Sequence, residues 1–212
     1  MRIEDLLKQF GAARASAIVR TDGTEKARLA MDAAVKGGFR FCEFTLTVPG
    51  ALDLVRDFSK RKGLVVGAGT VLTPDEARAA VDAGASFLVS PVVDEAVIAE
   101  AGRLGVAMIP GCATPTEMLR AHRAGAPLQK LFPAPGTGPA WVAQTLGPLP
   151  FLRIVPTSGV TLENAGAYLK AGAFALGFVN SLFDPADLAA GRFDAIEDRA
   201  RAMLGAITAA QR

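Results

Sequence analysis

Short apolar segments alternate with amphipathic segments along almost the whole chain. Apolar runs between Gly and Pro breakers predict buried strands, and apolar residues that recur at helical spacing predict helices. We expect strands at residues 15–20, 39–46, 64–68, 87–90, 106–110, 128–132, 152–156 and 175–179. We expect helices at residues 24–36, 51–62, 74–83, 94–104, 115–124, 139–146 and 162–171, and a last helical stretch that runs to the C-terminus. The helical spacing of Ile3, Leu6, Leu7 and Phe10 adds a short helix before the first strand.

The ends of these segments carry their own signals. Each predicted helix from residue 24 to residue 171 is followed by a glycine, the residue that most readily adopts the left-handed conformation that ends a helix. Thr73-Pro74-Asp75-Glu76 and Thr114-Pro115-Thr116-Glu117 each combine an N-cap threonine, a proline at the first helical position and acidic residues in the first turn. Helix starts are therefore expected at these two sites.

Regular alternation of strands and helices predicts a parallel sheet covered by helices. The eight strand–helix units fit one α/β domain over residues 1–212, a (β/α)8 TIM barrel with a short N-terminal helix. A doubly wound open sheet is the structural alternative, although it rarely carries eight such even repeats. No linker or low-complexity tract divides the chain.

Composition argues against several classes of protein. A net charge of +2 and no basic run longer than Lys60-Arg61-Lys62 give no reason to expect nucleic acid as a partner. No apolar run reaches the roughly 18 residues of a membrane span, and the charged N-terminus does not resemble a signal peptide. Cys42 and Cys112 lie far apart, which favours a reduced, cytoplasmic protein. The single histidine, His122, excludes a triad based on His and a metal site with several His ligands.

The segment Leu128-Gln129-Lys130-Leu131-Phe132 places one lysine inside a short apolar strand. Side chains alternate along a strand, so Lys130 shares a face with Leu128 and Phe132. A lysine buried there either finds an anionic partner or gives up its proton, and a neutral amine is a nucleophile toward carbonyl carbon. The stretch alone leaves both interpretations open: a Schiff-base lysine, and a structural lysine paired to a carboxylate.

Glu43 is the carboxylate most suited to work with Lys130. Alternation along residues 41–47 places Phe41, Glu43, Thr45 and Thr47 on one face, while the apolar outer positions face the covering helices. Strands two and six of a barrel lie opposite one another, so both ionisable groups are expected inside, near the same end. We interpret them as an amine nucleophile and a carboxyl group that carries protons.

Other polar residues follow the carboxyl ends of the strands, where reacting groups lie in such barrels. Glycines before Thr70 permit close approach of a ligand, although a tight turn uses the same residues. Loops after strands seven and eight often hold phosphate in this fold. Cys112, at the same end, has no neighbour in sequence that lowers its pKa, so we interpret it as a packing residue. The candidate substrate-binding residues are Arg20, Thr47, Thr70, Pro91, Thr157, Ser158, Gly159, Gly177, Asn180 and Ser181.

At these residues the chain resembles the class I aldolases that cleave 2-keto-3-deoxy-6-phosphogluconate and 4-hydroxy-2-oxoglutarate. The resemblance runs from the first strand to the last and rests on six ordered motifs. These are Phe41-Cys42-Glu43-Phe44-Thr45-Leu46-Thr47-Val48-Pro49, Val66-Gly67-Ala68-Gly69-Thr70-Val71, Val89-Ser90-Pro91, Ile109-Pro110-Gly111-Cys112-Ala113-Thr114-Pro115-Thr116-Glu117, Leu128-Gln129-Lys130-Leu131-Phe132-Pro133 and Val155-Pro156-Thr157-Ser158-Gly159-Val160.

The resemblance implies a homotrimer of (β/α)8 barrels that uses no metal or organic cofactor and acts on a small 2-keto acid. Lys130 matches the Schiff-base lysine of the family, and Glu43 matches the acid/base that moves protons together with a water. Thr70 and the backbone near Pro91 match positions that hold the pyruvyl carboxylate and carbonyl. Thr157 matches a residue that lines the hydroxyl-bearing part of the substrate.

Departures from the family pattern lie at the phosphate end. The Thr-Gly-Gly turn of the family reads Thr157-Ser158-Gly159 here, and its Gly-Ser after strand eight reads Val179-Asn180. Thr47 stands where some members carry Arg. We expect 2-keto-3-deoxy-6-phosphogluconate to be cleaved to pyruvate and glyceraldehyde 3-phosphate. The alternatives are 4-hydroxy-2-oxoglutarate, an unphosphorylated 2-keto-3-deoxy sugar acid, the 6-phosphogalactonate epimer, or a silent barrel that binds a sugar phosphate.

Overall fold

The computed structural model describes residues 1–210. Its strands are parallel and alternate with helices, except that β5 is followed directly by β6, so the chain is an α/β protein. Six strands form one sheet in the order β5-β4-β3-β2-β1-β9, and three form a second in the order β6-β7-β8. The strand bounds are β1 (Ala15–Val19), β2 (Phe41–Thr45), β3 (Val65–Gly69), β4 (Phe87–Val89), β5 (Ala107–Ile109), β6 (Gly111–Cys112), β7 (Gln129–Leu131), β8 (Ile154–Pro156) and β9 (Leu176–Phe178).

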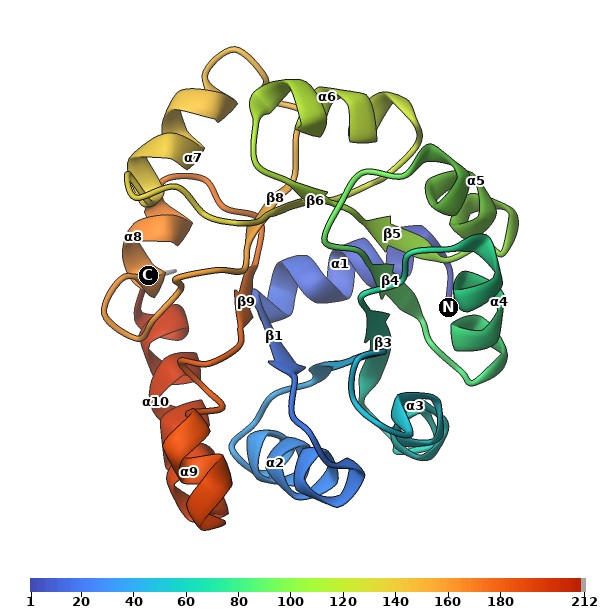
Figure 1. Cartoon of the computed structure of the whole chain (residues 1–212). Coiled ribbons are helices and arrows are strands. Elements are labelled where there is room, and N and C mark those ends of the chain that lie inside the picture. The colour runs from blue at the N-terminus through green and yellow to red at the C-terminus, as the bar shows by residue number, and fades with distance from the viewer. Residues whose placement is uncertain (211–212) are drawn as a thin grey trace.

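The two sheets curl around a common interior, with the helices other than α1 outside them (Figure 1). The fifth strand, expected at residues 106–110, is divided into β5 and β6 because Pro110 lies between them and has no amide hydrogen to donate. The Pro110 carbonyl still accepts a hydrogen bond from the Lys130 amide at 2.9 Å. At the other junction, the Phe174 amide donates to the Ile154 carbonyl at 2.8 Å. Backbone hydrogen bonds are thus present at both junctions between the two sheets, near β5/β6 and between the β8 and β9 segments.

The helices follow the predicted pattern, with bounds α1 (Ile3–Ala13), α2 (Thr24–Lys36), α3 (Ala51–Ser59), α4 (Pro74–Asp82), α5 (Glu95–Arg103), α6 (Pro115–Arg123), α7 (Pro139–Leu146), α8 (Ala165–Lys170), α9 (Pro185–Ala190) and α10 (Phe193–Ala210). Thr73 and Thr114 each form the expected capping box with the glutamate three residues later. The expectation of one helical stretch after the last strand was wrong. Gly191 adopts φ +67° and separates α9 from α10.

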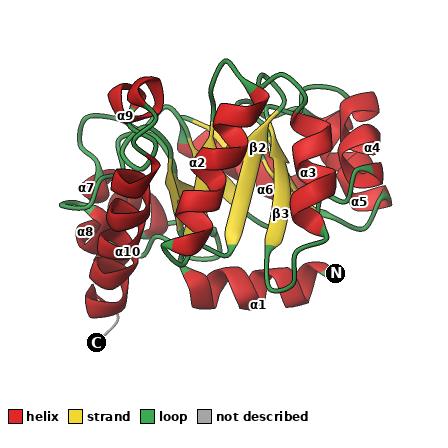
Figure 2. Ribbon diagram, turned by 90° about the horizontal axis from the view of Figure 1, so that it is seen from below, coloured by secondary structure: helices red, strands yellow, loops and turns green. Residues whose placement is uncertain are grey.

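Two apolar clusters lie on opposite faces of the strands. The outer cluster contains Cys42 and Phe44 and packs beneath the helices. The inner cluster contains Phe41 and Phe87 together with Phe10 from α1. The Phe10 ring stacks on the Phe41 ring, with centroids 4.5 Å apart. Figure 2 shows α1 lying across the end of the strands opposite to their carboxyl ends, so this helix closes the floor of the interior.

Both cysteines are buried and unpaired. Burial raises the pKa of the Cys42 thiol and of the Cys112 thiol to about 12, which makes a thiolate at neutral pH rare. Cys112 therefore packs in the outer cluster, as expected. Among residues 1–210 we find no helix with both the length and the apolar character needed to cross a bilayer.

Replacement of Phe10 by Ala tests the role of α1 as the floor of the interior. Phe10 is 2% exposed, so the variant should lower the free energy of unfolding by about 3–5 kcal/mol. Urea denaturation measures this change. Phe151→Ala is the matched control because Phe151 is 48% exposed, and it should change the free energy by less than about 1 kcal/mol. Equal losses for the two variants would contradict the floor role.

Candidate active site

Strand β2 places Glu43 inside the curled sheet. Along this strand Phe41 joins the inner cluster, whereas Cys42 and Phe44 join the outer one, as the alternation predicted. Glu43 pairs in register with Ile18 of β1 and with Gly67 of β3. Its carboxyl group lies over Gly69, where an added Cβ would come within 2.1 Å of Glu43 Oε1. The absence of a side chain at Gly69 therefore leaves the space that the Glu43 carboxyl group occupies.

Strand β7 places Lys130 inside in the same way. Gln129, its neighbour, is fixed by backbone partners, since its side-chain amide donates to the Ala126 carbonyl at 2.9 Å and accepts from the Arg153 amide at 3.0 Å. Lys130 pairs in register with Gly111 of β6 and with Val155 of β8. Its Nζ lies 4.7 Å from the centroid of the Phe132 ring.

Lys130 and Glu43 are both nearly without water, at 6% and 2% exposure. Burial is the main cause that lowers the pKa of Lys130; the Glu43 charge opposes this shift, and the Arg20 charge adds to it. Burial also raises the pKa of Glu43, against the opposing charges of Lys130 and Arg20. No hydrogen bond and no ion pair within 4.0 Å joins the two side chains among the described residues. Both shifts favour the uncharged forms, an amine and a carboxylic acid.

Two cavities meet at Lys130. The outer cavity measures about 440 Å³ and opens at the carboxyl ends of the strands. The inner cavity, about 10 Å³, lies deeper and is lined by Glu43. Lys130 and Thr157 line both cavities. A ligand in the outer cavity would thus meet the amine at its inner end, with the carboxyl group behind it.

The structure brings most of the predicted binding residues together. Arg20, Thr157, Ser158, Gly159, Asn180 and Ser181 line the outer cavity with Lys130, and Gly177 lines the inner one. Thr47, Thr70 and Pro91 line neither cavity. Thr47 lies in a separate open hollow of about 600 Å³ at the start of α3, with its hydroxyl 2.9 Å from that of Thr45.

Thr70 and Pro91 are adjacent to glycines that lie close to the two ionisable groups. Thr70 has φ +60°, in the left-handed region that is unusual for a threonine, and follows directly on Gly69. The backbone of Pro91 packs on Gly111, where an added Cβ would come within 2.3 Å of the Pro91 carbonyl oxygen. Gly111 is in turn the register partner of Lys130. Both residues are thus packed against neighbours of the two ionisable groups.

Sequence reasoning did not select several residues that line these cavities, among them Phe132, Asp184 and Ser16. Phe132 and Asp184 line the outer cavity, and Ser16 lines the inner one. Ser16 and Arg20 are four residues apart, so alternation along β1 places them on the same face. This signal in the sequence was sufficient to identify Ser16 as an inward residue. The Asp184 side chain accepts hydrogen bonds from the Ala186 and Asp187 amides at 2.8 and 3.1 Å and so caps α9. An N-cap before Pro185 was the available signal.

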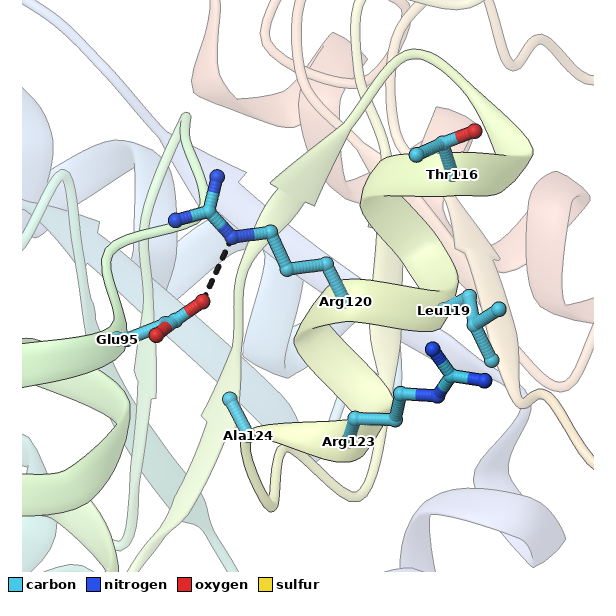
Figure 3. A pocket seen from close by; sticks show the side chains of 6 residues that line it. All are labelled: Glu95, Thr116, Leu119, Arg120, Arg123 and Ala124. Carbon is cyan, nitrogen blue, oxygen red and sulfur yellow. Dashed lines mark hydrogen bonds and ion pairs between the residues drawn. The ribbon is translucent and has the colours of Figure 1, made fainter.

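A further hollow of about 360 Å³ lies on the outer helices, away from Lys130. Figure 3 shows Arg120 of α6 reaching toward Glu95 of α5, and the two form an ion pair at 2.6 Å. Both side chains are exposed, and the remaining lining residues carry no nucleophile in a dry environment. This hollow lacks the features that distinguish the Lys130 site.

Comparison with known proteins agrees with this geometry. The family model for KDPG and KHG aldolase matches residues 3–198. A 2-dehydro-3-deoxy-phosphogluconate aldolase of Pseudomonas aeruginosa is 41% identical over 140 residues, and this match spans 65% of the chain and 64% of the relative, slightly under two thirds of each. A probable 2-dehydro-3-deoxy-6-phosphogalactonate aldolase of Rhizobium meliloti is 36% identical over 172 residues, which is 80% of the chain and 81% of the relative.

A solved structure adds chemistry to the comparison. KDPG aldolase of Legionella pneumophila, with pyruvate captured as a covalent carbinolamine intermediate, superposes with a TM-score of 0.78 and 25% identity. The superposition covers 91% of the chain and 97% of that protein. The family match over nearly all described residues, together with the buried lysine at the inner end of a cavity, leads to one conclusion: the chain belongs to the KDPG and KHG aldolase family.

Proposed function

We propose that this protein is a Schiff-base (class I) aldolase that reversibly cleaves 2-keto-3-deoxy-6-phosphogluconate to pyruvate and glyceraldehyde 3-phosphate. The observation that carries the proposal is Lys130, a buried amine with a lowered pKa at the inner end of a 440 Å³ cavity. A neutral amine in that place attacks the keto carbon of a substrate that enters from the strand ends.

Glu43 has the environment of a proton carrier. Its raised pKa keeps the carboxyl group protonated at higher pH than an exposed glutamate, so it has a proton to give to the oxygen of the former ketone. Loss of that oxygen as water leaves a protonated imine on Lys130. Glu43, now ionised, takes the proton of the C4 hydroxyl while the C3–C4 bond breaks and its electron pair moves toward the imine nitrogen. The products are the enamine of pyruvate and a free aldehyde.

The pyruvyl end of the substrate is assigned to Thr70 and the backbone near Pro91. Support comes from packing, because Thr70 follows the glycine that lies against Glu43 and Pro91 packs on the register partner of Lys130. Thr157 lines both cavities and is assigned to the hydroxyl-bearing middle of the substrate. Thr47 offers a hydroxyl rather than a charge at the rim of the strands.

The phosphate end is assigned to Arg20 and the loops after β8 and β9. Within residues 1–210, the backbone amides of Ser158, Gly159 and Asn180 donate to no protein group, and Arg20 adds a positive charge to the same cavity. Free amides and a guanidinium are the donors that phosphate needs. Gly177, Ser181 and the Asn180 side chain complete the proposed binding set.

Two observations favour a second candidate, the same chemistry on an unphosphorylated 2-keto-3-deoxy sugar acid, whose distal end carries no charge. 4-Hydroxy-2-oxoglutarate, whose distal carboxylate is also an anion, stays a further alternative. Val179 and the Asp184 carboxylate share the outer cavity with Arg20, and a carboxylate repels phosphate. The amides at the N-terminus of α9, which are potential donors to an anion, already donate to Asp184. The 6-phosphogalactonate epimer differs only in stereochemistry and stays an alternative.

The assembly around this site is part of the proposal. We infer a single domain whose two sheets form a closed (β/α)8 barrel, supported by the backbone bonds at both junctions. We also infer a homotrimer that acts on a small 2-keto acid, with neither nucleic acid nor a membrane as a partner. Its chemistry uses no metal or organic cofactor, since the lysine itself supplies the electron sink. A cytoplasmic location is supported by the two unpaired cysteines.

A silent barrel that binds a sugar phosphate is the alternative that is not an enzyme. In that case Lys130 and Glu43 would form a structural pair in direct contact. The absence of such a contact in the described chain counts against it. Lys130→Met separates the cases, because removal of one partner of a buried ion pair costs about 3–5 kcal/mol, whereas the proposed active site should lose activity and keep its fold.

Borohydride reduction in the presence of pyruvate tests the nucleophile. Reduction should fix a pyruvate-derived adduct on Lys130, even near pH 7, because the lowered pKa leaves part of the amine uncharged. Peptide mass spectrometry locates the adduct. Lys130→Met is the control and should gain no mass. An unmodified Lys130 in the wild-type protein would contradict the proposal.

Substrate preference tests the phosphate end. Arg20 and the free amides should give the phosphorylated sugar acid a kcat/KM at least about ten-fold above that of its unphosphorylated form. Arg20→Gln should reduce this preference. Arg40→Gln should leave it unchanged, because Arg40 precedes β2 and so lies at the amino ends of the strands, away from the outer cavity. Equal kcat/KM values for the two substrates in the wild-type protein would favour the unphosphorylated candidate instead.

Gly69→Ala tests the placement of Glu43. The added Cβ would meet Glu43 Oε1 at 2.1 Å, so the carboxyl group must move. A displacement of this kind in a catalytic group typically costs about 100-fold in kcat. Steady-state kinetics measures the loss, and circular dichroism confirms the fold. Gly102→Ala is the control, because an added Cβ there meets nothing within 4 Å. An unchanged kcat for Gly69→Ala would argue against Glu43 as the proton carrier.

A further inference from the structure

The inner cavity holds one polar side chain that the proposed chemistry leaves without a task. Ser16, on β1, is 3% exposed, and its Oγ has no hydrogen-bond partner among the protein groups of residues 1–210. In register it pairs with Phe41 on β2 and with Gly177 on β9, neither of which has a polar side chain. A buried hydroxyl without a partner costs free energy, so its presence requires a reason.

The space in front of Ser16 has the size and the lining of a water site. The inner cavity measures about 10 Å³, close to the smallest space that holds one water molecule, and such a water needs two to four polar partners. The polar lining residues are Ser16, Glu43, Lys130 and Thr157. The Thr157 hydroxyl donates to the Val155 carbonyl at 3.3 Å, so its oxygen remains free to accept.

Lys130 and Glu43 need a mediator if they are to exchange a proton. No direct hydrogen bond joins them in the described chain, yet both line the inner cavity. A polar contact across a gap longer than a hydrogen bond is commonly bridged by water. The unpartnered Ser16 hydroxyl lies at the same cavity and can both donate to and accept from a bridging molecule.

The family resemblance already implies a water that moves protons together with Glu43, and we propose that Ser16 is the residue that positions this water, in the inner cavity between Lys130 and Glu43. The inference rests on the proposed Schiff-base function and adds to it a residue on the floor side of the site. In this role Ser16 contacts neither the substrate nor the Lys130 nitrogen, and it acts only through the water.

Formation of the imine conserves all atoms and charges when the held water passes the proton. The Lys130 nitrogen lone pair forms the N–C bond, the carbonyl π pair moves to oxygen, and the Glu43 carboxylic acid gives that oxygen a proton. The nitrogen then gives one proton to the held water while the water gives another to the Glu43 carboxylate, so the water ends unchanged. Glu43 passes this proton to the hydroxyl group, which leaves as water while the nitrogen lone pair forms the C=N bond.

Hydrogen–deuterium exchange of the pyruvate methyl group isolates this half of the reaction, because it needs the imine and the enamine but no aldehyde. We expect Ser16→Ala to lower kcat for exchange about ten-fold, the effect of losing one hydrogen bond that orients the water, with KM for pyruvate unchanged within about two-fold. Proton NMR in D2O measures both constants. Ser16→Thr, which keeps a hydroxyl, should retain most of the rate.

Thr145→Val is the matched control, since Thr145 is also buried but lies on α7, away from both cavities. It should exchange at the wild-type rate. A wild-type kcat for Ser16→Ala would overturn the proposal, as would a loss in Ser16→Ala that appears in KM rather than in kcat.

A crystal structure of the wild-type protein supplies a test that does not depend on the variants. It should show one water within hydrogen-bond distance of Ser16 Oγ, Lys130 and Glu43; a dry cavity, or a water that misses either ionisable group, would overturn the proposal. Borohydride trapping of pyruvate by the wild-type protein separates the two levels. If the wild-type protein does not trap pyruvate, the proposed aldolase function is contradicted. If it traps pyruvate normally and Ser16→Ala exchanges at the wild-type rate, only the role of Ser16 is contradicted.

Discussion

The removal of water from Lys130 and Glu43 is the constraint on which the rest of this structure depends. Each group is buried, and no direct ion pair with another residue of the described chain compensates for the lost hydration. The protein therefore favours their neutral forms, and this is the state in which an amine attacks a ketone and a carboxylic acid gives up a proton. Reactivity and the cost of burial have the same physical origin here, so an environment that stabilised both charges would also silence the site.

The fold creates this dry environment by separating two faces of each strand. Outward side chains pack beneath the helices, and inward side chains form a second apolar cluster that α1 closes with Phe10. The floor is thus sealed at the amino ends of the strands, while the carboxyl ends stay open to a 440 Å³ cavity. Lys130 lies at the boundary between these regions, close enough to the opening to meet a substrate and deep enough to lose its hydration.

Much of this arrangement follows from local sequence. Period-two alternation placed Lys130 and Glu43 inside, and capping boxes at Thr73 and Thr114 fixed two helix starts, because these effects act over a few residues. The pattern did not predict the division of the fifth strand at Pro110, since an apolar run looks the same with or without its ladder bonds. It also did not reveal that Thr47 lies outside the cavity or that Ser16 lacks a partner. Those facts depend on the distances between strands that are far apart in the chain.

The two ends of the site are under different kinds of control. At the inner end, register fixes each reacting group from both sides, with Lys130 between Gly111 and Val155 and Glu43 between Ile18 and Gly67. At the outer end, loops supply Ser158, Asn180 and Asp184, and their side chains replace or accompany the bare backbone that the family pattern favours. Because loops tolerate substitution and paired strands do not, the substrate can change while the lysine chemistry stays constant. Arg20 belongs to both ends, since it follows β1, lines the outer cavity and shifts the pKa of both Lys130 and Glu43. An anion bound by Arg20 would cancel part of its charge, which would weaken the effect of Arg20 on both pKa values and so couple recognition of the distal group to the protonation of the reacting pair.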